Sequence, residues 1–326
     1  MVRQACNVAP CRLPPVCAPT KVPISEAQSP ELRLARLPKQ GCGVLVPQPS
    51  LETLMNRISI KGIFLHGLVF ALAMSLTLSS FAQQIQLSPG LKLYDSFDQR
   101  LINPAKWYTQ WQCGSPSVME CEREIQDGQL HLRIRAYGST ATNDGNQFGT
   151  TGIFFTSSSV TDIAAQAVVQ ETSAQGCPAL TGAGTHAQAL LAGSFFNGGG
   201  GTSDDDVQAF LQFDRYSTDT PGAVLVGGFL KYQGQFFGNV NVGTVNVGDH
   251  VFVELKWDKA NHRFVERLYK SSTNSWSEQS LPYTIPDSIP AIAPYKQLSA
   301  NVFADNCIGT QTFADMGINF NNVLTN

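Results

Sequence analysis

The sequence has few charged residues. Asp, Glu, Lys and Arg make up 14% of its 326 residues, and the 22 Lys and Arg do not outnumber the 25 Asp and Glu. Without a basic excess the chain cannot neutralise many phosphates, so nucleic acid is excluded as the expected partner. The 28 glycines and 19 phenylalanines are unlike a coiled coil or a disordered chain. The composition predicts a folded protein with enough apolar material for a core.

Residues 1–54 lack any sustained hydrophobic period, and they hold nine of the 18 prolines. We predict no fold for them. Residues 55–82 resemble a secretory signal peptide, with a basic start, an apolar run from Gly62 to Leu78 and the small residues Ser80 and Ala82 at its exit. A transmembrane anchor is the alternative, since the run approaches the ~20 residues of a span. Export signals begin a chain, so residues 1–54 are interpreted as an over-extended start, or else as a pro-segment.

We therefore expect a secreted or periplasmic protein that has no membrane contact after cleavage. The remaining residues, 83–326, are predicted to form one domain. They carry 14 Lys and Arg against 22 Asp and Glu, which makes this part of the chain acidic.

The predicted domain contains four cysteines and lacks the CxxC and paired histidine spacings of zinc sites. Export permits disulfides, and an even number of cysteines favours them. Three pairings are open for Cys113, Cys121, Cys177 and Cys307. In one of them Cys113 pairs with Cys121 across a short loop, and Cys177 pairs with Cys307 across a long one.

No window of 12 or more residues in this domain keeps a helical period, whereas period-two alternation is frequent. In Gln129–Arg135, Leu130 and its two neighbours in phase are apolar, while the residues between them are His or Arg. Val207–Asp214 and Val251–Trp257 are further strand-like stretches, and a phase slip at Gly243 indicates a bulge or tight turn. Many short strands without helices between them predict an all-β sandwich or barrel.

Both ends of the domain carry short motifs of a known type. Tyr94-Asp95-Ser96-Phe97-Asp98, followed by Asn103-Pro104-Ala105-Lys106-Trp107 and the Asp127-Gly128 strand start, resembles the opening of domains in the concanavalin A-like lectin and glucanase superfamily. Met316–Val323 is similar to the last strand of laminarinase-type glycoside hydrolases. The resemblance implies a jelly roll of two curved antiparallel sheets that binds glycans across the concave sheet or at the loops.

The catalytic motif of the laminarinase-type enzymes is missing where it is expected. Those enzymes carry two or three carboxylates on one mid-domain strand, and Gln208–Asp214 stands there with a single carboxylate and two glutamines. Three glutamates between Glu120 and Glu124 come too early and are interpreted as a solvated edge. If the protein is an enzyme, the candidate pair is Glu171 with Asp214, placed across neighbouring strands; the alternative is that Glu171 faces solvent.

Mixed aromatic and polar surroundings select the candidate ligand-binding residues, because sugars stack on aromatic rings and hydrogen-bond to polar groups. These residues are Trp111, Gln212, Asp214, Arg215, Tyr216 and Tyr232. Asp204, Asp205 and Asp206 follow four glycines, and a structural calcium ion is one interpretation of this loop. The other interpretation is a mobile acidic tip without a metal.

The expected function is an exported protein that binds a poly- or oligosaccharide without catalysis. A glycoside hydrolase or polysaccharide lyase with a different catalytic constellation is the first alternative. A structural or adhesion module of the cell envelope that binds no sugar is the second.

Overall fold

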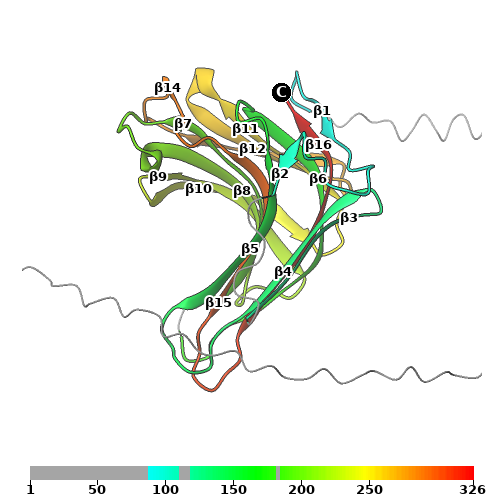
Figure 1. Ribbon diagram of the computed structural model, residues 1–326, viewed down its shortest axis with the longest axis vertical. Coiled ribbons are helices and arrows are strands. Elements are labelled where there is room, and N and C mark those ends of the chain that lie inside the picture. Colours follow the sequence, from blue (N-terminus) through cyan, green and yellow to red (C-terminus); the bar gives the residue numbers. More distant parts are fainter. Residues whose placement is uncertain (1–86, 110–117, 181–183) are drawn as a thin grey trace, which may run out of the picture. The chain divides into compact units, whose positions relative to one another are not determined.

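The computed structural model describes residues 87–109, 118–180 and 184–326, which belong to one compact unit of the chain. The predicted signal peptide, the segment before it, Trp111 and Cys113 lie outside the described residues. The described residues form two antiparallel sheets that lie in two layers (Figure 1). This architecture confirms the predicted all-β jelly-roll sandwich.

Sheet A has the order β13-β12-β11-β6-β16-β4-β3, with β1 paired to β16. Its strands are β1 (Lys92–Asp95), β3 (Met119–Gln126), β4 (Gln129–Tyr137), β6 (Asp162–Gln175), β11 (Val251–Asp258), β12 (Arg263–Lys270), β13 (Ser275–Pro282) and β16 (Phe313–Thr325).

Sheet B has the order β10-β9-β8-β7-β15-β5-β2, with β14 paired to β7. Its strands are β2 (Trp107–Tyr108), β5 (Asn146–Phe155), β7 (His186–Asn197), β8 (Asp206–Tyr216), β9 (Ala223–Tyr232), β10 (Gln235–Asn246), β14 (Ile289–Pro290) and β15 (Lys296–Asp305). Helix in the described residues is limited to 3₁₀ turns at Ser203–Asp205 and Lys259–Asn261, and none of it has the length and apolarity to cross a membrane.

Strand alternation determines which side chains form the core. In β4, Leu130, Leu132 and Ile134 are fully buried between the sheets, and the residues between them lie on the outer face. The inner face of β8 likewise carries Val207 and every second residue through Phe213. The predicted phase slip at Gly243 is confirmed as a bulge in the pairing of β10 with β9.

The glutamates between Glu120 and Glu124 lie on β3, the strand at one edge of sheet A, and their side chains are exposed. Glu120 and Glu122 lie within 4.0 Å and 3.6 Å of Arg135 and His131 on β4. This placement agrees with the interpretation of a solvated edge, and charged side chains on an edge strand discourage pairing with another chain.

Glu266 and Lys296 are ionisable side chains that lie within the core, each against a glycine. Glu266 of β12 points across the sandwich at Gly228, where a Cβ atom would collide with the carboxyl group. Lys296 of β15 lies beside Gly193, its partner in register on β7. The Lys296 ammonium donates hydrogen bonds to the carbonyl oxygens of two residues, at 2.7 Å and 3.3 Å, and lies 4.2 Å from the centre of a phenylalanine ring. Among the described residues no carboxylate forms an ion pair with it.

A disulfide joins Cys177, just after β6, to Cys307, just after β15, across a sequence separation of 130 residues. It links the ends of strands from the two sheets, and it confirms one of the pairings that the sequence left open. Cys121 is also disulfide-bonded. Its predicted partner Cys113 lies outside the described residues.

Replacing both cysteines by alanine (Cys177→Ala with Cys307→Ala) is expected to lower the free energy of unfolding by about 2–5 kcal/mol, because the unfolded chain regains the freedom that a long closed loop removes. Equilibrium denaturation without reductant measures this loss. Adding reductant should destabilise the parent protein more than the double variant. Equal free energies of unfolding for the parent protein and the double variant would show that the disulfide does not stabilise the fold.

Lys296→Met is expected to stabilise the protein at low pH. Burial lowers the pKa of Lys296 to about 7 from its ordinary 10.5, so the folded state binds fewer protons than the unfolded state between these values. The parent protein therefore gains stability as pH rises through this window. The advantage of the variant should be on the order of 2 kcal/mol at pH 6, because the variant also loses hydrogen bonds. It should fall by about 4 kcal/mol up to pH 10.5, where the parent protein is expected to be the more stable of the two. Denaturation at both pH values tests this, and an advantage that does not change with pH would contradict it.

Candidate functional site

The outer face of sheet B carries two adjoining hollows of about 660 Å³ and 600 Å³. They share four lining residues, Gln188, Phe229, Phe236 and Phe303, and we refer to the two together as the sheet B groove. The groove runs across the sheet, since strands β5, β15, β7, β8, β9 and β10 all contribute side chains. Each of the two hollows has the size of an ordinary ligand pocket, for which ~300–1,000 Å³ is typical.

Aromatic rings form much of the lining. Phe210 and Phe229 stack with their centres 4.6 Å apart, and Phe236 stands edge-on to Phe229 at 5.0 Å. Farther along, the His186 ring stacks on Phe303 at 4.4 Å. Phe236 is 67% exposed, so its ring faces the open side of the groove. A contiguous set of exposed rings rimmed by polar groups is typical of an interaction site.

Uncharged polar groups lie between the rings. They include the amides of Gln188, Gln208, Gln212, Asn239, Gln297 and Asn301, and the hydroxyls of Thr150 and Ser299. Neighbouring strands hold several of them in place, for example through the bond that Thr150 Oγ1 donates to Asn301 Oδ1 at 2.7 Å. Lys231 and His186 are the ionisable cations among the lining residues, and none of these residues is an Asp or Glu. The groove therefore offers stacking faces and neutral hydrogen-bonding groups.

One acid lies beneath this surface. Asp214 is 2% exposed and faces the same side of β8 as Gln212, whose amide donates a hydrogen bond to it. Its other oxygen has no hydrogen-bond partner among the described residues. Burial raises the pKa of Asp214 to about 7, against the lowering effect of the amides of Gln188 and Gln212. The carboxyl group thus stays largely protonated below neutral pH, and the groove floor is then uncharged.

The arrangement does not match retaining glycoside hydrolysis. That reaction needs two carboxyl groups about 5–5.5 Å apart, one on each side of the scissile bond. Among the described residues, the lining of the groove holds no carboxyl group, and Asp214 lies below it without a second acid in the lining. Asp219, which adds to the raised pKa of Asp214, lies in the turn after β8 and accepts a hydrogen bond from the backbone N–H of Tyr216.

The structure brings together three of the candidate ligand-binding residues. Gln212 and Tyr216 line the groove, and Asp214 lies beneath it between them. Arg215 points to the opposite side of β8, where it is buried and its guanidinium donates to the carbonyl oxygen of Tyr216. Tyr232 also lies on the inner side of its strand and packs against the core beside Gly198. Neither Arg215 nor Tyr232 lines the groove, because alternation turns each of them away from it.

The predicted pairing of Glu171 with Asp214 across neighbouring strands is wrong. Glu171 belongs to β6 in sheet A, where it is in register with Gly317 and forms an ion pair with Arg133. Asp214 belongs to β8 in sheet B, where its partners in register are Gln188 and Leu225. The two residues lie on different sheets, so they cannot act on one bond.

Asp205 and Asp206 of the glycine-rich loop have different hydrogen-bond partners. Asp205 accepts hydrogen bonds from Thr202 and Gln233, and Asp206 accepts them from Asn197 and from two backbone amides near residue 292. No group of three or more His, Cys, Asp or Glu side chains able to hold a metal occurs within the described ranges. A calcium ion held by Asp204, Asp205 and Asp206 stays a prediction from the sequence.

Most of the groove residues are not among the candidate ligand-binding residues predicted from the sequence. Phe210, Phe229, Gln188 and Asn301 lie in alternating stretches whose other phase forms the core. A signal for Phe210 was present, because it shares its phase with Gln208, Gln212 and Asp214 and so must point outward. An aromatic ring in the polar phase of a strand is the pattern that could have identified it.

Comparison with known proteins gives similarity to solved structures alone. No family model matches, and no curated protein matches. Winged bean acidic lectin complexed with methyl-alpha-D-galactose is 10% identical, with a TM-score of 0.38 over 72% of this chain and 98% of that one. Peanut lectin with a nine-residue peptide is 12% identical, with a TM-score of 0.29 over 67% and 96%.

Scytalido-glutamic peptidase with a peptide-based transition-state analogue is 16% identical, with a TM-score of 0.31. That match covers 48% of this chain and 65% of the peptidase, so the chain spans less than two thirds of that structure. The evidence for the fold is the pair of antiparallel sheets itself. Similarity at this level says nothing about ligand or activity.

Asp214→Asn is expected to stabilise the protein at high pH. The pKa of Asp214 is about 7 in the folded state against an ordinary 3.8, so the folded state binds more protons between these values and the parent protein loses stability as pH rises through them. The variant should match the parent near pH 4 and exceed it by up to about 4 kcal/mol at pH 8. Denaturation at the two pH values measures this, with Asp144→Asn at an exposed turn as the control. A variant that is less stable at pH 8 would contradict the expectation.

Proposed function

We propose that the protein is an exported carbohydrate-binding β-sandwich whose sheet B groove receives a stretch of a neutral poly- or oligosaccharide. The observation that carries this proposal is the composition of the groove, in which aromatic rings alternate with uncharged amides and hydroxyls. Aromatic faces pack against the C–H groups of a sugar ring. Amides and hydroxyls both donate and accept hydrogen bonds, as sugar hydroxyls require.

The extent of the groove favours several sugar units over one. Its two hollows adjoin along the sheet, and their shared residues lie between them. Tyr108 and Phe154 stack at one end, with their centres 5.2 Å apart, while Tyr216 and Asn239 line the other end. An extended chain that lies across the strands would meet a ring at each end and amides in the middle.

Two features support export. Residues 55–82 have the layout of a signal peptide, and the Cys177–Cys307 disulfide suits an oxidising compartment. A secreted or periplasmic location would also give the groove access to polysaccharide.

A hydrolase or lyase that acts through Asp214 is the second candidate. The observation in its favour is the pKa of about 7 of a buried acid beneath a groove, since shifted pKa values occur often at active sites. Binding without catalysis is preferred because among the described residues no second carboxyl group lines the groove.

Phe236→Ala is expected to weaken binding to a retained polysaccharide by about tenfold or more, because it removes an exposed stacking face. Affinity electrophoresis against a panel of neutral polysaccharides, followed by titration calorimetry with the best one, measures this loss. Ile308→Ala is the matched control, since Ile308 is 62% exposed and does not line the groove. Retention that is equal in the two variants and the parent would contradict a role of the groove.

The same polysaccharides, incubated with the parent protein, are expected to gain no new reducing ends and no unsaturated products. Product formation that Asp214→Asn abolishes would replace binding by catalysis as the function of the groove.

A further inference from the structure

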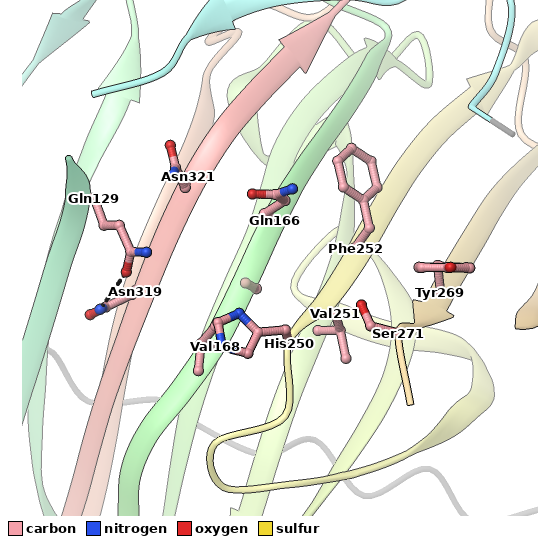
Figure 2. Close-up of a pocket in the computed structure, with 11 residues that line it drawn as sticks. Gln129, Gln166, Val168, His250, Val251, Phe252, Tyr269, Ser271, Asn319 and Asn321 are labelled. Carbon is pink, nitrogen blue, oxygen red and sulfur yellow. Dashed lines mark hydrogen bonds between the residues drawn. The ribbon is translucent and has the colours of Figure 1, made fainter. Parts of the chain in front are cut away.

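The outer face of sheet A carries a smaller hollow on the opposite side of the sandwich from the groove. It has a volume of about 260 Å³, and we call it the sheet A hollow. Strands β6, β11 and β16 form its floor, and the turns that precede β11 and follow β12 close one side (Figure 2). Its polar lining residues are Gln129, Gln166, His250, Tyr269, Ser271, Asn319 and Asn321.

Three side-chain amides of this hollow accept a hydrogen bond through their oxygen atoms. Gln129 Oε1 accepts a hydrogen bond from Asn319 Nδ2 at 2.7 Å, which is the dashed line in Figure 2. Gln166 Oε1 accepts one from the side chain of Asn322 at 2.9 Å, and Asn321 Oδ1 accepts one from the backbone N–H of Asn322 at 2.7 Å. Among the described residues none of the three amide NH₂ groups donates to a protein acceptor. The hollow thus presents fixed N–H donors that lack partners.

Hydrogen bonds at both ends of the Asn319 side-chain amide fix the orientation of this set. Its Oδ1 lies 2.7 Å from Nδ1 of His131, and its Nδ2 donates to Gln129. Because the amide accepts at one end and donates at the other, the NH₂ group of Gln129 is left for a ligand. A donor that is already oriented loses less entropy when a ligand binds.

An aromatic wall lies beside these donors. Phe252 and Tyr269 line the hollow, and Trp276, the partner of Tyr269 in register on β13, lies next to both, with ring centres at 6.3 Å and 5.3 Å. The Tyr269 hydroxyl donates its hydrogen to Asn274 Oδ1 at 2.6 Å. Toward a ligand, its oxygen can therefore act as a hydrogen-bond acceptor. A ring beside oriented donors and an acceptor is suited to a sugar with its hydroxyl groups at the rim.

No Asp, Glu, Lys or Arg is among the residues that line this hollow. An ionised ligand would lose hydration here without meeting an opposite fixed charge, which is unfavourable. The volume corresponds to roughly nine water molecules in the liquid and lies just below the usual range of ligand pockets. Both features select a small neutral ligand that is rich in oxygen acceptors.

We propose that the sheet A hollow binds a single neutral sugar unit, such as the free end of a glycan, independently of the sheet B groove. The class of ligand rests on the proposed function, and the location rests on the hollow alone. Since the outer faces of the two sheets point in opposite directions, one molecule would then hold two glycan strands at once.

The test is a titration of the purified protein with neutral monosaccharides at millimolar concentration, followed by saturation-transfer NMR. Ser271→Trp should block the mouth from an exposed position and lower binding at least tenfold. Gln166→Ala should lower it about tenfold, because it removes one of the fixed donors. Gln170→Ala, an exposed residue on the same strand outside the lining, is the matched control and should leave binding unchanged.

The two sites are expected to fail separately. Phe236→Ala should weaken retention on polysaccharide and leave monosaccharide binding intact, and Ser271→Trp should do the reverse. If retention fails while the monosaccharide still binds and responds to Ser271→Trp, the groove proposal falls and this one stands. Monosaccharide binding that is undetectable, or insensitive to both hollow variants, overturns the present proposal. Tighter binding of a uronate than of a neutral sugar overturns the neutral class.

Discussion

The packing of two apolar sheet faces against each other is the constraint on which the rest of the molecule depends. Each strand commits every second residue to a shared core that runs from Leu130 on β4 to Phe213 on β8 and Phe320 on β16. Burial of this surface is the main source of stability. Because side chains alternate, it also fixes which residues point outward. The sheet B groove and the sheet A hollow are built mainly from this outward phase, so the strands that form the core also determine where their side chains lie.

The core also contains groups that oppose folding. Lys296 and Glu266 lie between the sheets, and burial moves the pKa of each toward its neutral form, lowering that of Lys296 to about 7 and raising that of Glu266 well above its ordinary value. Gly193 and Gly228 provide the space that these long side chains need. The long-range disulfide acts in the opposite direction, since it restricts the unfolded chain. Stability therefore depends on a large apolar core that tolerates a few costly polar groups.

Much of the fold could be predicted from the sequence because alternation is a local property. The strands around Leu130, Phe213 and Val253 and their inner faces follow from period two alone. Alternation also separates Arg215 from Asp214 and Tyr216, so its assignment to the site was avoidable. What the sequence could not supply is the sheet to which a strand belongs. Glu171 and Asp214 are 43 positions apart on different sheets, and the crossovers that separate them are set by non-local pairing of β6 with β16 and of β8 with β7.

The outward aromatic residues are the part of this structure that folding does not explain. Phe236 is 67% exposed beside Phe229, and neither ring is needed to fill the core. An exposed apolar surface on a sheet favours unwanted association, so its persistence points to a ligand that covers it. The amides between the rings hydrogen-bond to water, so this surface is hydrated without added charge. Since burial holds the pKa of Asp214 at about 7, the floor also stays largely uncharged in mildly acidic solution. Apart from Lys231 and His186, the groove presents aromatic rings and neutral hydrogen-bonding groups, which suit a ligand rich in hydroxyl groups.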